Sequence, residues 1–326
     1  MRTKTGVSLY LCRQRLGRLR SIFCLTKPTI SCCRIDAEHK APYYFCVIRL
    51  AVITGASSGL GSVYAKLIDR RKDIDEIWLI ARREDRLLAL ASELIHPAIV
   101  LPLDLTKPAS VDRLKTAFES KAKRSPFDEL ALSSAAEKRG GSGMTIVFFV
   151  NCAGVGKIGN YDDIKREDNE RMISLNCTAL VNAALVSLPY MERGSRIINV
   201  SSTSAFQPFQ HFAVYAATKA FVLSWSRALR WELFPRGIRV TAVCPYWMKK
   251  TEFIKNAKLS AVRSSYLIRN FYFGDDPVVA AHLSLWASAL NLPVVTTGAV
   301  STLHRIIAKV IPREIMQSLW ELWRLL

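Results

Sequence analysis

The chain has 326 residues, of which 50% are hydrophobic and 22% charged, so it carries enough apolar side chains for a large core. Its 46 Lys and Arg residues against 27 Asp and Glu give a net charge of +19, which favours polyanionic or phosphorylated partners. The sequence lacks zinc-finger, homeodomain and aromatic RNA-binding patterns, and no apolar run approaches the roughly 20 residues of a membrane-spanning helix. These features exclude a linker protein and argue against a nucleic-acid partner and an integral membrane protein.

Residues 1–45 differ in character from the rest of the chain. They contain nine Lys and Arg residues but two acids, and they show no helix or strand periodicity. Three interpretations stay open, namely a non-native or mis-assigned start, a disordered basic arm, or a targeting segment. We expect deletion of residues 1–45 to leave folding and activity intact. Cysteines are frequent there, but no CxxC pair or partner histidine supports a metal or disulfide framework, so a reducing, cytoplasmic location fits best.

From residue 47 onward, short apolar runs alternate with segments of helical period, which is typical of βαβ units. The pattern predicts an α/β fold with a doubly wound parallel sheet in one domain, residues 46–298. A basic, Gly-rich stretch, residues 121–143, is predicted to be an exposed insertion. The candidate strands are residues 48–53, 77–81, 98–103, 145–150, 196–200 and 238–243.

A glycine-rich turn, Thr54 to Gly61, follows the first predicted strand and precedes a helical stretch, residues 62–70. Its glycines allow a tight turn, leave room for a pyrophosphate at the backbone and aim helix N–H groups at the anion. The turn therefore predicts a dinucleotide site, with a plain surface turn as the alternative. The candidate contacts are Gly55, Ser57, Ser58, Gly59, Leu60 and Gly61.

The residues after the second strand indicate which dinucleotide binds. About 20 residues beyond the glycines, an acid would hold a ribose 2′-hydroxyl, but this chain has Arg82 and Arg83 there. Two guanidinium groups favour a 2′-phosphorylated ribose and hence NADP(H) over NAD(H); the alternative is a solvated pair that begins the next helix. Asp104, after the third strand, either hydrogen-bonds adenine or caps a turn.

Polar residues follow the fourth and fifth strands, at the sheet edge where open α/β sheets bind ligands. The fourth strand leads into the sequence Asn-Cys-Ala-Gly at residues 151–154, and the fifth into Ser201 and Ser202. Tyr215 and Lys219 then begin a helical stretch, and their i, i+4 spacing places them on one helix face. The phenol and the ammonium group can thus point into one cleft. The alternative interpretations are a strand-end cap for Ser202 and a core aromatic for Tyr215.

Together these motifs resemble the short-chain dehydrogenase/reductase family from about residue 50 to about residue 277. The resemblance implies a Rossmann fold, with coenzyme pyrophosphate on the glycine turn and a sheet-stabilising motif formed by Asn151, Ala153 and Gly154 beside the adenosine. It also implies that the catalytic residues are Asn176, Ser202, Tyr215 and Lys219. No metal is implied.

The roles that the resemblance implies fit the chemistry of carbonyl reduction by hydride. Tyr215 would donate the proton, and the Lys219 cation would shift that phenol toward its ionised form while Lys219 also holds the nicotinamide ribose. Ser202 would hydrogen-bond the carbonyl oxygen, and Asn176 would hold a water that links Lys219 to solvent. The alternative for Asn176 is a hydrogen bond inside a helix.

The match departs from the family after the sixth strand. Tyr246 replaces the usual glycine, and Thr251, the candidate for a contact with the nicotinamide carboxamide, comes one place late. Residues 252–274 are predicted to form a substrate-side lid, and Asp276 with Pro277 to begin a helix.

Apolar residues suggest the substrate class. Phe206, Pro208, Phe209 and Phe212 precede Tyr215, which suggests a hydrophobic, lipid-like ketone, with a packing cluster as the alternative. Residues 299–326 show apolar residues at helical spacing, predicting an amphipathic extension that packs in an oligomer, covers the pocket or contacts a membrane surface peripherally.

The sequence thus predicts an NADP(H)-dependent oxidoreductase that interconverts a ketone or aldehyde and an alcohol on a small or lipid-like substrate. We expect a homodimer or homotetramer. The alternatives are a non-catalytic dinucleotide-binding scaffold or redox sensor and a ketoacyl-thioester reductase. A binding protein would need neither Ser202 nor Tyr215, which argues against the scaffold.

Overall fold

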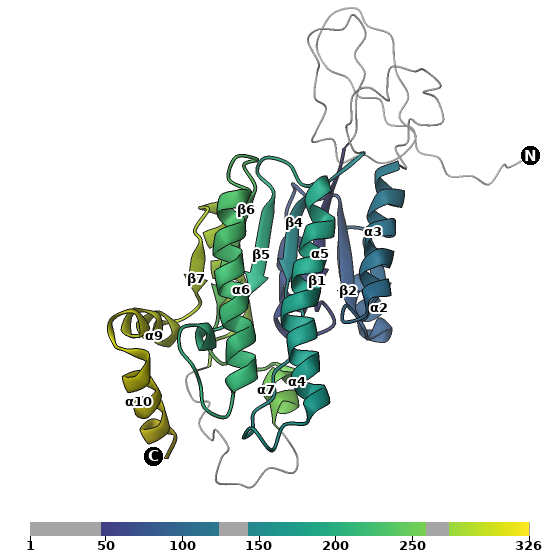
Figure 1. The fold of residues 1–326 in the computed structure, drawn as a ribbon. Coiled ribbons are helices and arrows are strands. Elements are labelled where there is room, and N and C mark those ends of the chain that lie inside the picture. Colours follow the sequence, from purple (N-terminus) through teal and green to yellow (C-terminus); the bar gives the residue numbers. More distant parts are fainter. Residues whose placement is uncertain (1–46, 124–142, 259–273, 326) are drawn as a thin grey trace, which may run out of the picture. The chain divides into compact units, whose positions relative to one another are not determined.

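The computed structural model describes residues 47–123, 143–258 and 274–325. Within these ranges, seven parallel strands form one sheet in the order β3-β2-β1-β4-β5-β6-β7 (Figure 1). The order reverses between β1 and β4, which is where doubly wound sheets open a ligand crevice. The strands are β1 (Ile48–Thr54), β2 (Glu76–Ala81), β3 (Ala98–Pro102), β4 (Met144–Asn151), β5 (Arg196–Val200), β6 (Arg239–Cys244) and β7 (Val294–Thr296).

Helices cover both faces of the sheet. One core cluster joins the sheet to α1, α2 and α8, and a second joins it to α3, α5 and α6. The helices are α1 (Gly59–Ile68), α2 (Glu84–Ser92), α3 (Pro108–Lys123), α4 (Arg166–Ile173), α5 (Leu180–Ser187), α6 (Ala213–Glu232), α7 (Glu252–Ala257), α8 (Pro277–Ala289), α9 (Ala299–Val310) and α10 (Arg313–Leu325). Shorter helical turns are η1 (Ser174–Ala179), η2 (Leu188–Tyr190) and η3 (Thr203–Ala205).

The central strand β1 shows why the sheet needs helices on both sides. Its side chains alternate, so Ala51 and Ile53 enter the first core cluster and Leu50 and Val52 enter the second. All four are fully buried. A strand buried on both faces is apolar throughout, which is the continuous pattern seen in the sequence.

The structure confirms the predicted fold class and all six predicted strands. The seventh strand, Val294–Thr296, was not predicted, because three residues after Pro293 are too short to show a strand pattern. Asp276 caps α8 as expected, since its carboxylate accepts hydrogen bonds from the amides of Val278 and Val279.

Three sequence predictions fall mainly on residues outside the described ranges. Residues 1–45 lie outside the described residues, as does the insertion apart from residues 121–123 and Gly143. The predicted lid is described only over residues 252–258 and at Gly274, where the helical part is α7.

One helix of the described chain meets the length and composition of a membrane span, although no such segment was recognised from the sequence. It runs from Arg166 to Tyr190, covers 25 residues and has a mean hydropathy of 1.5 in its most apolar window. In the fold it lies along the sheet, where Met172, Ala183 and Ala184 are fully buried. Packing therefore accounts for part of its apolar character, since 39% of that window is buried.

Candidate active site

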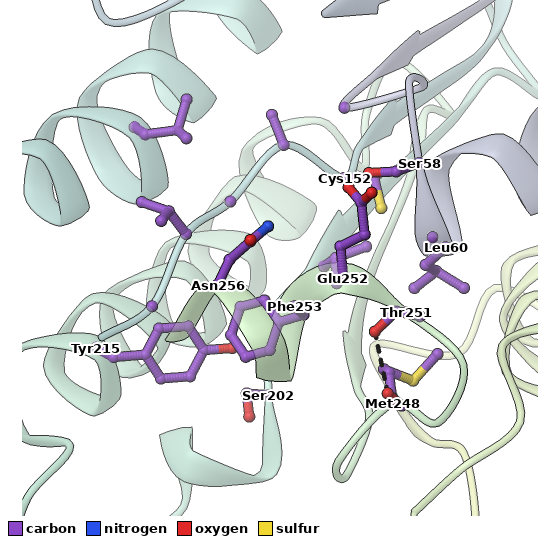
Figure 2. A pocket seen from close by; sticks show the side chains of 18 of the residues that line it. Ser58, Leu60, Cys152, Ser202, Tyr215, Met248, Thr251, Glu252, Phe253 and Asn256 are labelled. Carbon is purple, nitrogen blue, oxygen red and sulfur yellow. Dashed lines mark hydrogen bonds between the residues drawn. The ribbon is translucent and has the colours of Figure 1, made fainter. Parts of the chain in front are cut away.

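A pocket with a cavity volume of about 340 Å³ lies at the carboxyl ends of the strands. The glycine turn and the loop after β2 line one part of it, and residues of β5, α6, α7 and α10 line the rest. Figure 2 shows this pocket with Tyr215, Ser202 and Phe253 near one another. Of the predicted site residues, those that line the pocket are Gly55, Ser57, Ser58, Gly59, Leu60, Arg82, Arg83, Asp104, Ala153, Gly154, Ser202, Tyr215, Lys219 and Thr251.

The glycine turn leaves no room for side chains at two of its three glycines. Gly55 has a φ of 69°, and a Cβ there would lie 2.7 Å from the amide nitrogen of Ala153. At Gly61, in the first turn of α1, a Cβ would collide with the carbonyl oxygen of Gly55. The turn is thereby pressed against the neighbouring strand end, and its open side forms a cradle for an anion at a helix N-terminus.

Arg83 lies beside this cradle. Its guanidinium group donates hydrogen bonds to Ser58 Oγ at 2.9 Å and to Ser57 Oγ at 3.2 Å, so it is held over the turn. Its remaining nitrogen donates to Glu252 Oε2 at 2.8 Å. Arg82 is exposed at the rim of the same pocket. Both arginines thus line the pocket beside the glycine turn, and their contact with a 2′-phosphate stays a prediction.

The segment after β4 is anchored to the glycine turn by one hydroxyl group. Thr54 Oγ1 accepts hydrogen bonds from the amides of Cys152 and Ala153, both at 3.1 Å. Asn151 lies deeper, where it donates to Asn199 Oδ1 at 2.9 Å across the sheet, and it does not line the pocket. Asn151 therefore links β4 to β5, and its predicted role in stabilising the sheet beside the adenosine stays a prediction.

Asn176 sits in a π-helical turn, η1, between α4 and α5. Its side chain is fully buried and bonded to Val155 on both sides, accepting from the amide at 2.9 Å and donating to the carbonyl at 2.8 Å. It also donates to Thr218 Oγ1 at 3.0 Å. A Cβ placed on Gly154 would lie 3.3 Å from both Asn176 Oδ1 and Lys219 Nζ, so the two side chains meet beside that glycine. Single π turns often mark functional sites.

Tyr215 and Lys219 lie one turn apart on α6 and are both buried at the pocket wall. Lys219 Nζ donates to the carbonyl of Val200 at 2.8 Å and lies 5.6 Å from the centroid of the Tyr215 ring. Ser202 follows β5, and its hydroxyl accepts from the amide of Ser204 at 3.1 Å. The three side chains are brought together as the sequence predicted.

The electrostatics of this cluster differ in one respect from the expectation. Burial raises the pKa of Tyr215 above that of a free phenol, and a hydrogen bond with Ser202 offsets only part of this effect. The predicted lowering of the Tyr215 pKa by Lys219 is therefore wrong for this geometry, because desolvation is the largest influence on the phenol and the opposing one comes from Ser202. Burial also lowers the pKa of Lys219, to about 8.

Two other predicted contacts have clear local roles. Asp104 Oδ1 accepts from the amide of Thr106 at 3.2 Å and from its hydroxyl at 2.8 Å, so it caps a turn while also lining the pocket. Thr251 Oγ1 donates to the carbonyl of Met248 at 3.0 Å (Figure 2). A Cβ on Gly59 would lie 3.4 Å from the Thr251 side chain, so Thr251 lies against the glycine turn despite its late position.

The other end of the pocket is aromatic. The rings of Phe212 and Tyr215 stack with centroids 4.1 Å apart, and Phe253 of α7 lies 5.5 Å from the Tyr215 ring. Trp320 of α10 packs edge-on against Phe209 with centroids 4.7 Å apart and lines the pocket. The C-terminal extension therefore contributes one side chain, Trp320, to the pocket wall, and its predicted role as a cover stays a prediction. Trp320, Phe253 and Glu252 lie in segments for which the sequence predicted a lid or an extension, but they were not predicted individually as pocket residues, because no local pattern singles them out.

The geometry is that of a dinucleotide-binding fold with a phenol, a hydroxyl and an amine at the sheet edge, and comparisons with known proteins agree. The family model described as short chain dehydrogenase matches residues 49–260, and the chain belongs to this family. It is therefore a short-chain dehydrogenase/reductase enzyme, an oxidoreductase that binds a nicotinamide dinucleotide and acts on small molecules.

Relatives and solved structures support the same assignment. An uncharacterized oxidoreductase of Staphylococcus epidermidis is 30% identical over 220 residues, covering 65% of this chain and 86% of the relative. A short-chain dehydrogenase from Sphingobium yanoikuyae, solved in complex with NADPH, is 26% identical with a TM-score of 0.59, covering 82% of this chain and 97% of that one. A short-chain dehydrogenase from Streptomyces avermitilis, at 21% identity and a TM-score of 0.65, covers 84% of this chain and 96% of its own and shares the fold.

Proposed function

We propose that the enzyme uses NADP(H) to interconvert a ketone or aldehyde and an alcohol on a hydrophobic small molecule. One observation carries the proposal. A single pocket holds Arg82 and Arg83 at one end and Tyr215, Ser202 and Lys219 at the other. The first pair suits a phosphate, and the second group suits a carbonyl that must be polarised and protonated.

The residues present fit the coenzyme. Gly55 and Gly61 leave a cradle that a Cβ would fill, and the backbone N–H groups at the start of α1 would hold the pyrophosphate. Arg82 and Arg83 would hold the 2′-phosphate, and the NADPH in the Sphingobium yanoikuyae enzyme supports this preference. When bound, the coenzyme supplies or accepts the hydride.

The chain's own residues would handle the proton and the developing charge. Tyr215 stays protonated at neutral pH because burial raises its pKa, so its hydroxyl is ready to donate a proton to an alkoxide. Ser202 would hydrogen-bond the carbonyl oxygen, and Lys219 would hold the nicotinamide ribose. Asn176 fixes Val155 and Thr218 around this cluster, and its role in holding a water stays a prediction.

The pocket wall supports a hydrophobic substrate. The aromatic side chains around Tyr215 exclude water and offer flat apolar surface, with few polar groups to fix orientation. They come from three separate parts of the chain, and the set is Phe209, Phe212, Trp247, Phe253 and Trp320. A lipid-like ketone matches this wall better than a sugar or an amino acid would.

A coenzyme oxidation assay over a panel of carbonyl compounds tests the proposal. Ketones of rising apolar size, together with acyl thioesters, are incubated with enzyme and NADPH or NADH, and the loss of reduced coenzyme is followed by absorbance. We expect turnover with apolar ketones and a preference for NADPH. A clear preference for NADH, or turnover confined to small polar carbonyls, would contradict it.

Two further features of the proposal concern assembly and location. We expect a homodimer or homotetramer in the cytoplasm, which size-exclusion chromatography with light scattering will measure. Outward-facing apolar residues also lie on the C-terminal helices, and they are Leu303, Ile306, Val310, Ile315, Leu319 and Leu322. Contact of residues 299–326 with a membrane surface stays a prediction, which liposome co-sedimentation of Leu303→Ser and Ile306→Ser variants tests without removing Trp320 from the pocket.

A further inference from the structure

An ion-pair bridge crosses the coenzyme end of the pocket. The two carboxylate oxygens of Glu252 accept from different arginines, Oε2 from Arg83 at 2.8 Å and Oε1 from Arg86 at 2.6 Å. Glu252 is the first residue of α7, and the arginines lie at the start of α2, about 170 residues earlier in the chain. The bridge therefore links the part of the pocket assigned to the coenzyme with the helix beside Tyr215.

The ion-pair bridge occupies the guanidinium group of Arg83, which a bound 2′-phosphate would need. Arg83 uses two of its nitrogens on Ser57 and Ser58 and the third on Glu252, so every nitrogen of its guanidinium group is engaged. A phosphate dianion that approaches Arg83 meets the Glu252 carboxylate as a like charge on the same donor. The two anions compete for one site.

The Glu252 carboxylate stays charged at neutral pH. Hydrogen bonds from Arg86 and Arg83 hold the pKa of Glu252 at about 2, well below that of a free glutamate. Neutral pH therefore does not remove the competition. Only movement of the carboxylate away from Arg83 can do so.

Arg86 can keep the Glu252 carboxylate paired after a phosphate displaces it from Arg83. Arg86 does not line the pocket, while Glu252 and Arg83 do. The side chains of Glu252 and Arg86 are 37% and 42% exposed, so the pair can rearrange without breaking a buried core. A 2′-phosphate can thus take Arg83 while Glu252 keeps Arg86, so the carboxylate never loses its last partner.

We propose that Glu252 is a built-in competitor for the 2′-phosphate and sets how strongly the enzyme prefers NADP(H), with Arg86 as the partner that retains the displaced carboxylate. This inference rests on the proposed function. It also couples the two ends of the pocket, because the next residue, Phe253, packs on the Tyr215 ring and lies against Gly156. Coenzyme binding then adjusts α7 beside the phenol before a substrate enters.

Equilibrium binding without substrate tests the inference. Affinities for NADPH, NADH, adenosine 2′,5′-bisphosphate and 5′-AMP are measured by fluorescence and calorimetry for the wild type and for Glu252→Gln, which keeps the size and hydrogen bonding of the side chain. We expect NADPH and the bisphosphate to bind roughly threefold to tenfold more tightly to the variant, with NADH and 5′-AMP unchanged. A merely structural role for Glu252 would weaken all four ligands together.

Matched variants separate the possible failures. Glu93→Gln removes an exposed ion pair with Lys66 away from the pocket and should change nothing. Arg86→Met should weaken NADPH, and combining it with Glu252→Gln should restore tight binding, because no carboxylate then needs a partner. Suppose Glu252→Gln fails to tighten NADPH binding while Arg83→Met lowers the preference for NADPH. The proposed competition by Glu252 is then overturned, and the assignment of NADP(H) as coenzyme stands. If Arg83→Met leaves the preference unchanged, both are overturned.

Discussion

The ammonium group of Lys219 donates to the carbonyl oxygen of Val200 at 2.8 Å and lies 5.6 Å from the centroid of the Tyr215 ring. This contact ties α6 to the end of β5, so the phenol is held close to the strand end that Ser202 follows. The position is costly for a cation, because burial removes its water. Burial accordingly lowers the pKa of Lys219 to about 8.

This shift predicts a pH dependence. Because the Lys219 pKa is lowered, the cation is present below about pH 8 and is lost as the pH rises through that value. We expect kcat/KM for NADPH in ketone reduction to be flat near neutral pH and to fall above about pH 8, since this ratio reports groups of the free enzyme. In a Lys219→Met variant the residual rate should lose this titration. A profile that stays flat to about pH 10 would contradict the role given to the cation.

Gly61→Ala should abolish coenzyme binding. Alanine is the better helix former at the start of α1, but its Cβ would collide with the carbonyl of Gly55, so the turn must shift away from its cradle. We expect the affinity for NADPH to fall by at least about tenfold in a fluorescence titration. Gly194→Ala is the control, because a Cβ there meets nothing within 4 Å and only its φ of 95° is unfavourable. That variant should lose about 1 kcal/mol of stability and keep its affinity for NADPH.

Asn176→Ala should lower both the free energy of unfolding and the rate of catalysis. Three hydrogen bonds disappear, and the partly buried amide and carbonyl of Val155 lose their partner at the pocket wall. The expected loss is about 2 to 4 kcal/mol in the free energy of unfolding, measured by urea titration. Asn160→Ala, at a position whose described hydrogen bonds come from the backbone amide and carbonyl alone, serves as the control and should stay within about 0.5 kcal/mol of wild type. Equal free energies of unfolding for the two variants would contradict a stabilising role of the Asn176 hydrogen bonds.

Trp320→Ala should change substrate use without changing coenzyme binding. The indole packs on Phe209 and lines the pocket, so its loss opens the apolar wall to water. We expect KM for bulky apolar ketones to rise about tenfold, with a smaller effect on small ketones and an unchanged affinity for NADPH. Leu319→Ala removes an exposed neighbour on the same helix and should leave these constants as they are. A uniform loss across all ketones would indicate that α10 only stabilises the fold.

The sequence predicted those parts of the site that depend on local pattern. Gly55, Gly59 and Gly61 belong to a turn whose preceding strand and following helix are both visible in the local sequence. Tyr215 and Lys219 share a helix face by spacing alone. The parallel sheet then brings strand ends together, so residues that follow different strands meet at one edge.

Contacts made by distant segments could not be predicted in the same way. Glu252 meets Arg83 across 169 positions, and Trp320 reaches Phe209 across more than a hundred, so no periodicity connects them. The direction of the Tyr215 pKa shift also required the structure, because only the packing shows that burial of the phenol has a larger effect than its hydrogen bond with Ser202.

The most direct test of the account is a pair of measurements on Tyr215→Phe, with the exposed Tyr161→Phe as the control. NADPH affinity is measured by fluorescence, and single-turnover reduction of a ketone that the wild type accepts is followed by absorbance. The account predicts unchanged NADPH affinity and a rate at least about a thousandfold lower for Tyr215→Phe, with wild-type values for Tyr161→Phe. Retention of the wild-type reduction rate by Tyr215→Phe would contradict it.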